Sequence, residues 1–100
     1  MTYMKKTLFL LTIVLSFRAM AQPNIENATI STIKIKNHIH LLQWTGAGNM
    51  MLLSGKDGNI LIDDQFAPLS EKINTAIQAV NKGPIKFLFN THYHGDHSGG

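Results

Sequence analysis

The sequence contains no cysteine, 3 prolines and only 15% charged residues among its 100 positions. Without cysteine the chain cannot form a disulfide scaffold, a Cys-based zinc finger, a cysteine nucleophile or a lipid-modified N-terminal cysteine. A chain of 100 residues accommodates at most one small domain. Because 44% of the residues are hydrophobic, the composition also excludes a disordered, collagen-like or coiled-coil chain.

The N-terminus lacks the apolar run of about 20 residues that crosses a bilayer comfortably. Two lysines instead precede a shorter apolar run over residues 7–17, which is followed by a small-x-small site ending at Ala21. These features predict a secretory signal peptide over residues 1–21, although Arg18 is unusual in a cleavage region. We therefore expect an exported protein, periplasmic or secreted, with residues 22–100 as its mature part. The alternative is an uncleaved anchor and a membrane-anchored enzyme.

The basic excess belongs mostly to this leader. Cleavage after Ala21 would remove three of the nine basic residues and leave six, which balance the six acidic residues. A nearly neutral chain without a stripe of basic and aromatic residues is not expected to bind nucleic acid or an anionic membrane surface. We expect a small-molecule substrate as the partner, and no stable membrane association after cleavage.

Short β-type runs separated by turn signals follow the lead-in. They occupy residues 30–35, 38–44, 50–54 and 60–62, with a turn at 46–49 and an Asp-Gly hairpin signal at 57–58. This pattern predicts a meander of four short strands.

The hydrophobic period changes after Pro68. Ser70 is a candidate N-cap, and apolar residues recur at helical spacing until Gly83 and Pro84 end the helix expected over 70–81. Residues 85–89 then form a second buried-type strand. Strand, helix and strand predict a βαβ unit, in which a ligand lies beyond the carboxyl ends of the strands. Those ends carry the acidic pair 63–64 and residues 90–92.

Residues 91–100 contain the side chains most suited to binding a metal ion. In an extended segment, side chains two positions apart share a side, so His92, His94 and Asp96 can converge. His97 joins them if the chain turns at Gly95. Imidazole and carboxylate donors suit zinc, and also manganese or iron. Four donors within six residues exceed what one catalytic zinc takes from one segment, which indicates ligands shared between two metals; the alternative is a solvated polar loop.

The segment Asn90-Thr91-His92-Tyr93-His94-Gly95-Asp96-His97-Ser98-Gly99-Gly100 resembles the zinc-binding motif of the metallo-β-lactamase fold superfamily. The strand Gly58–Asp63 resembles the strand ending in Asp that precedes this motif in the family. The resemblance covers roughly residues 30–100 and places the chain with class B β-lactamases, glyoxalase II-type thioesterases and lactonases. It implies an α/β fold of the α+β sandwich type, of which this chain would supply the N-terminal half of an αββα arrangement.

The resemblance also implies roles for single residues. His92 and His94 would bind a first zinc, and Asp96 and His97 a second. Asp63 would orient the ligand loop, a role that Asp64 could share. Zinc lowers the pKa of bound water to about 7, so a metal-bound hydroxide could attack an ester- or amide-type carbonyl while Asp96 orients it as a catalytic group.

Several expectations concern weaker or missing features. His38 and His40 could form a metal clip but are more simply read as solvent-facing, and the residues at 98–100 are expected to begin a helix. We expect Trp44, Met50 and Met51 in the core or at a hairpin tip, and Tyr93 in packing or in the loop.

The family's later ligands are absent from these 100 residues. We therefore expect a fragment of an exported hydrolase that is inactive by itself; the alternative is a non-catalytic remnant or metal-binding module.

Overall fold

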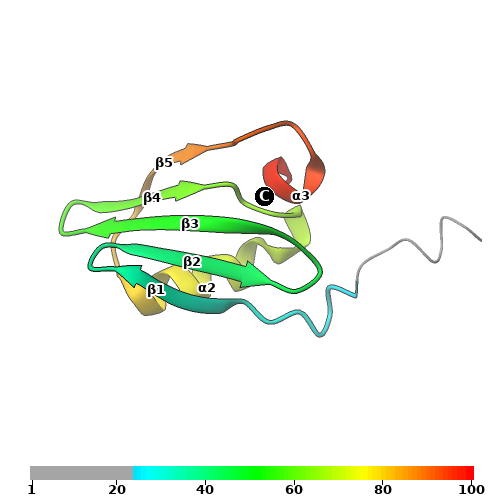
Figure 1. Cartoon of the computed structure of the whole chain (residues 1–100), viewed down its shortest axis with the longest axis horizontal. Helices are drawn as coiled ribbons and strands as arrows, with labels where there is room; N and C mark the ends of the chain where they lie inside the picture. The colour runs from blue at the N-terminus through cyan, green and yellow to red at the C-terminus, as the bar shows by residue number, and fades with distance from the viewer. Residues whose placement is uncertain (1–23) are drawn as a thin grey trace, which may run out of the picture.

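The computed structural model of the protein describes residues 24–100 (Figure 1). The predicted signal peptide, residues 1–21, therefore lies outside the described residues. The elements in chain order are β1 (Ser31–Lys36), β2 (Ile39–Trp44), β3 (Ala47–Gly55), β4 (Gly58–Ile62), the 3-10 turn η1 (Ala67–Leu69), α2 (Ser70–Val80), β5 (Ile85–Phe89) and α3 (Gly95–Ser98). Among these residues, no helix is long and apolar enough to cross a membrane.

The strands form one five-stranded sheet in the order β1-β2-β3-β4-β5. Strands β1 to β4 pair antiparallel, and β5 pairs parallel with β4 after the chain returns through α2. The predicted meander and the predicted βαβ unit are both confirmed. A mixed sheet with helices packed beside it is an α+β architecture.

The turn before β3 is shorter than the sequence predicts. It occupies Thr45 and Gly46, whereas residues 47–49 already belong to β3, in which Asn49 pairs with Gln43. Gly46 is required at this turn, because a Cβ there would overlap the indole ring of Trp44. The glycine-rich stretch is therefore half turn and half strand.

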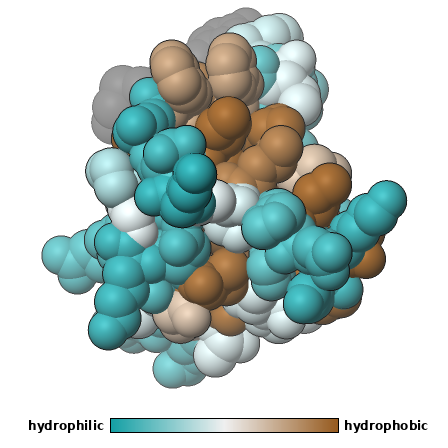
Figure 2. Space-filling model, turned by 90° about the vertical axis from the view of Figure 1, so that its left-hand side faces the viewer, coloured by the Kyte–Doolittle hydropathy of each residue, from teal (hydrophilic) through white to brown (hydrophobic). Residues whose placement is uncertain are grey.

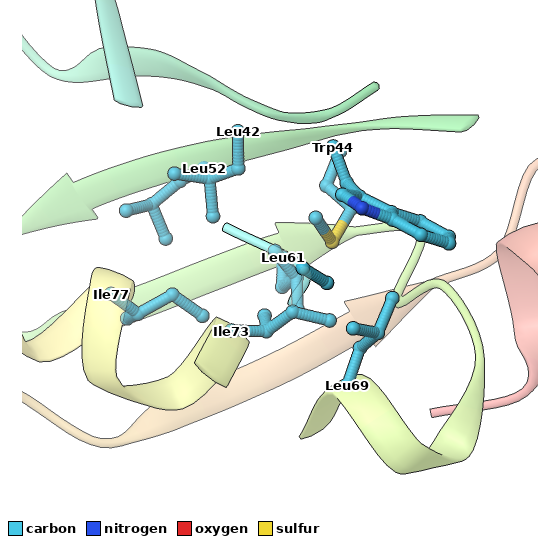
Figure 3. Packing of buried hydrophobic residues seen from close by; sticks show 9 residues of the cluster. Leu42, Trp44, Leu52, Leu61, Leu69, Ile73 and Ile77 are labelled. Carbon is cyan, nitrogen blue, oxygen red and sulfur yellow. The ribbon is translucent and has the colours of Figure 1, made fainter. Parts of the chain in front are cut away.

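One face of the sheet packs against η1 and α2 to form the core. Strand side chains point toward the helical layer, and the buried apolar cluster comprises Ala28, Leu42, Trp44, Met50, Leu52, Leu61, Leu69, Ile73 and Ile77 (Figure 3). Ile73 and Ile77 lie one helical turn apart, as the helical periodicity predicts. Trp44 and Met50 are core residues as expected, while Met51 is 39% exposed.

Ser70 is the first residue of α2 and not its N-cap, which corrects the sequence prediction. The 3-10 turn η1 runs directly into α2, so Leu69 already has helical backbone angles. The Ser70 hydroxyl donates back to the carbonyl of Ala67 at 2.7 Å and caps no helix N–H. The helical run begins a turn earlier because Pro68 is accommodated in the first turn of η1.

The opposite face of the sheet carries a row of paired apolar residues with one member on each strand: Ile33, Leu41, Met51, Ile62 and Phe89. The sequence predicts β5 as a buried strand, but Phe87 and Phe89 are 58% and 56% exposed and stack on each other. This prediction is wrong because no segment within residues 24–100 lies over this face, and on the other face α2 still leaves Leu88 45% exposed. Figure 2, a view of one end of the sheet, shows hydrophobic surface left open between hydrophilic side chains.

Strands β4 and β5 end at the same edge of the sheet, and α3 lies beside these ends (Figure 1). The helix expected to begin at Ser98 instead spans Gly95–Ser98, with Gly99 as its C-cap. The backbone N–H groups of His97 and Ser98 both donate to the carbonyl of His94 at 3.0 Å. The chain therefore turns at Gly95, which is the condition for His97 to approach the other histidines.

Candidate metal centre

Asp63 joins the carboxyl ends of β4 and β5. Its backbone N–H donates to the carbonyl of Phe89 at 2.8 Å. Its carboxylate accepts hydrogen bonds from Thr91, with the backbone N–H at 2.7 Å from Oδ1 and the hydroxyl at 2.8 Å from Oδ2. A buried carboxylate thus fixes the start of the histidine segment (residues 91–100), and the role of Asp63 in orienting metal ligands stays a prediction.

Asp63 also holds His97. Its Oδ2 lies 2.7 Å from Nδ1 of His97, so Nδ1 carries the hydrogen and donates. In the neutral imidazole this leaves Nε2 with a free lone pair, the form in which histidine binds a metal. Oδ2 of Asp96 lies 3.5 Å from the same Nε2. His97 and Asp96 therefore present an imidazole nitrogen and a carboxylate oxygen side by side.

The environment of Asp63 favours its ionised form. Burial alone raises the pKa of the Asp63 carboxyl, but the hydrogen bonds from the Thr91 backbone, from His97 and from the Thr91 hydroxyl outweigh burial and hold this pKa below its ordinary value. A carboxylate that stays ionised is a permanent acceptor. It can therefore keep the imidazole of His97 in one orientation.

The other two histidines of this segment, His92 and His94, lie close to His97 and to each other in sequence along the loop, with His92 beside both of the other rings. The His92 ring lies 4.2 Å from the His97 ring and 4.8 Å from the His94 ring, measured between centroids. Both His92 and His94 are exposed, and the Ser98 hydroxyl secures the loop by donating to the carbonyls of Tyr93 and His94 at 3.0 Å. The three imidazoles thus lie together at the sheet edge.

This donor set fits zinc in kind, since three imidazoles and a carboxylate meet at one edge and a buried carboxylate supports one of them. Within residues 24–100, however, no group of three or more His, Cys, Asp or Glu side chains is arranged to hold a metal ion. The donors of this segment lie near one another, but three of them do not point to one common position. The positions expected as ligands are close together, but their ligand roles stay a prediction.

Two residues of the site were not singled out from the sequence. Gln65 is fully buried with a positive φ of 60°, and its amide donates to the carbonyls of Ala47, at 2.8 Å, and of Gly48. The backbone carbonyl of Gln65 accepts hydrogen bonds from the backbone N–H groups of Gly99 and Gly100. Gln65 therefore ties the start of β3 to the end of the histidine segment. No local sequence signal marks it, because a Gln after two acidic residues is typical of a loop.

Gly48 is the second missed residue. A Cβ at Gly48 would lie 2.7 Å from the carbonyl oxygen of Asp96 and 3.1 Å from Nε2 of His97. Only glycine lets β3 pass this close to α3. The recurrence of glycine at positions 46 and 48 is the sequence signal for this close approach, although the pattern by itself predicts only a turn.

Asp64 also contributes to this edge. Its backbone N–H donates to the carbonyl of His97 at 3.0 Å, and its Oδ1 accepts a weak hydrogen bond from Asn90 at 3.3 Å. The Asn90 amide donates as well to the carbonyl of His97 at 2.7 Å. Asp64 therefore contacts the backbone of α3, and the orienting role expected for it stays a prediction.

The weaker candidates lie elsewhere. His38 is in the turn before β2, and it lines, with His40, an open groove of about 610 Å³ beside the end of α2. The two histidines therefore do not share a strand as expected, and nothing within the described chain adds a third donor to them. Tyr93 is 86% exposed and lies beside the ring of His94, so it belongs to the loop and not to the packing.

Comparison with known proteins adds to this geometry. A search of curated proteins finds no match to this chain. The family profile described as the metallo-beta-lactamase superfamily matches residues 44–100, which include β3, β4, α2, β5 and the whole histidine segment. The match thus covers more than half of the chain and every residue of the candidate centre. The chain belongs to the metallo-β-lactamase superfamily.

Proposed function

We propose that this protein is a zinc-dependent hydrolase that acts on a small molecule with an ester- or amide-type carbonyl. The observation that carries the proposal is the 2.7 Å hydrogen bond from His97 to Asp63, with Asp96 lying 3.5 Å from the free nitrogen of His97. This arrangement supports the proposal because a metal-bound histidine is usually held through its other ring nitrogen by a carboxylate.

The proposed ligands divide into two sets. His92 and His94 would hold one ion, and Asp96 and His97 a second. When bound, zinc supplies a nucleophilic water at neutral pH and polarises the substrate carbonyl. The chain's own residues supply positioning. Asp63 holds His97 through the hydrogen bond to Nδ1, on the side of the ring opposite the free Nε2. Asp96, whose side chain is 30% exposed, is accessible to orient a water molecule.

The proposal also includes export of the protein. The leader-like sequence over residues 1–21 supports delivery to the periplasm or the outside, where the substrate would be met. The near balance of charge in residues 22–100 supports a small-molecule substrate over a nucleic acid or a membrane surface.

The test is a hydrolysis assay with the complete natural protein that carries residues 1–100 and a panel of four substrate classes: a β-lactam, a thioester, a lactone and a simple ester. We expect turnover of one class that a chelator abolishes and added Zn²⁺ restores. Asp96→Asn should lower this turnover by at least about 100-fold, because general-base assistance is typically worth 10² to 10⁴. Glu71→Gln, in the exposed first turn of α2, is the matched control and should retain it.

A second candidate is a metal-binding module without turnover. The finding that favours it is that His97 and Asp96 form a donor pair while no closed three-donor group is present within residues 24–100. This candidate predicts Zn²⁺ binding that depends on His97, together with no zinc-restored hydrolysis of any of the four classes. The same assay, combined with a zinc titration, separates the two.

A further inference from the structure

The hydroxyl of Thr91 lies between Asp63 and His92. Its Oγ1 is 2.8 Å from Oδ2 of Asp63 and 2.9 Å from Nδ1 of His92. The backbone N–H of Thr91 is separately bonded to Oδ1 of Asp63 at 2.7 Å, so the residue is held at two points and its hydroxyl has little freedom.

The direction of these hydrogen bonds follows from the donors available. Oδ1 of Asp63 accepts the backbone N–H of Thr91, and Oδ2 accepts the hydrogen of the Thr91 hydroxyl, so the carboxylate acts as an acceptor at both oxygens. The hydroxyl has one hydrogen, and it points to Asp63. Toward His92 the hydroxyl can then offer only a lone pair, so Nδ1 of His92 has to be the donor.

The same carboxylate oxygen also accepts from Nδ1 of His97 at 2.7 Å. We propose that Thr91 is a positioning residue through which Asp63 sets the tautomer of His92, while Asp63 sets the tautomer of His97 directly. The metal consequence of this inference rests on the proposed function; the tautomer itself does not.

The consequence is that both imidazoles keep Nε2 as their free nitrogen. The two rings lie 4.2 Å apart between centroids, and in the proposed ligand sets they belong to different ions. One buried carboxylate therefore prepares both halves of the centre for metal before any ion binds. Thr91, which is not itself a candidate ligand, links the first half to this carboxylate.

The test reads tautomers directly by ¹⁵N NMR of the imidazole nitrogens in the metal-free full chain, at a pH at which the histidines are neutral. We expect His92 and His97 both to carry the proton on Nδ1. In Thr91→Val the lone-pair acceptor is lost, and His92 should shift toward the form protonated on Nε2 while His97 is unchanged. Thr91→Ser keeps the hydroxyl and should restore the wild-type spectrum of His92.

Thr75→Val is the matched control, because it removes a threonine hydroxyl that bonds only within α2, to the carbonyl of Glu71 at 2.9 Å. It should change neither imidazole. If the chain binds Zn²⁺, Thr91→Val should weaken that binding by about 10- to 100-fold and Thr75→Val should not.

The wild-type spectrum is decisive even if a variant fails to fold. A His92 that carries its proton on Nε2 overturns the proposal, as does a Thr91→Val protein whose amide spectrum is native and whose His92 is unchanged. Failure of the chain to bind Zn²⁺ or to hydrolyse any substrate would count against the proposed function, whereas the tautomer measurement stands independently of both.

Discussion

Gly48 lies against His97 so closely that a Cβ at position 48 would be 3.1 Å from Nε2 of that histidine and 2.7 Å from the carbonyl oxygen of Asp96. The approach joins β3, from the antiparallel part of the sheet, to α3, which follows the parallel strand β5. The position of the proposed ligand nitrogen is thus set by a residue nearly fifty positions earlier.

Gly48→Ala should separate β3 from α3. We expect a loss of stability of about 1–3 kcal/mol, as for other overpacked sites, and a displaced His97 ring. Urea denaturation and the imidazole resonances of His97 measure the two effects. Gly55→Ala is the matched control in the same strand, because a Cβ there meets nothing within 4 Å. Equal behaviour of the two variants would contradict the packing argument.

Gln65→Leu removes the amide that bonds the carbonyls of Ala47 and Gly48. These carbonyls would lose their partner, which costs about 1–3 kcal/mol of stability. Chemical denaturation should show this loss. Gln43→Leu serves as the control because the Gln43 amide bonds only an exposed Asn49 side chain, at 3.3 Å. If Gln65→Leu is as stable as the wild type, Gln65 does not tie β3 to the histidine segment.

The depressed pKa of Asp63 predicts a specific pH dependence of stability. An acid whose pKa is lower in the folded state contributes stability that is fully present above its unfolded pKa, about 3.9. This contribution is lost as the pH falls from about 4 through the lower folded pKa. Urea unfolding of the wild type should therefore weaken steeply on acidification in that range.

Asp63→Asn should flatten this acid dependence, because the carboxylate that titrates is gone. Asp57→Asn, in the exposed turn between β3 and β4, controls for the change in net charge. An acid limb in Asp63→Asn as steep as that of the wild type would show that other groups cause it.

The two faces of the sheet should respond differently to truncation. Leu42 is fully buried under α2, so Leu42→Ala should destabilise by about 2–5 kcal/mol. Ile33, in the row on the uncovered face, is 43% exposed, and Ile33→Ala should cost no more than about 1 kcal/mol. Thermal unfolding of the full chain compares them. A large loss for Ile33→Ala would mean that the uncovered face is packed against something in solution.

The elements that the sequence predicted correctly are those whose signal is local. Alternating and apolar runs locate β1 to β5, and the spacing of Ile73 and Ile77 locates the buried side of α2. The histidine segment was recognisable because its donors lie within six consecutive residues, and Asp63 because parallel strands end at one edge.

The remaining features depend on tertiary contacts. The position of Ser70 follows from η1 joining α2, and the exposure of Phe87 and Phe89 from the absence of a covering layer within the described residues. Neither is encoded in a local period. The role of Gln65 requires a positive φ and a buried amide that reaches another strand, which spacing along the chain does not reveal.

The central claim is that residues 92–97 form a zinc centre supported by Asp63. The most direct measurement is a calorimetric titration of the metal-free full chain with Zn²⁺, repeated with His97→Ala, Asp63→Asn and the control Glu71→Gln. We predict saturable binding from which His97→Ala removes the ion held by Asp96 and His97, which Asp63→Asn weakens by about 10- to 100-fold, and which Glu71→Gln leaves unchanged. The absence of saturable binding, or binding of equal strength in all four proteins, would contradict the account.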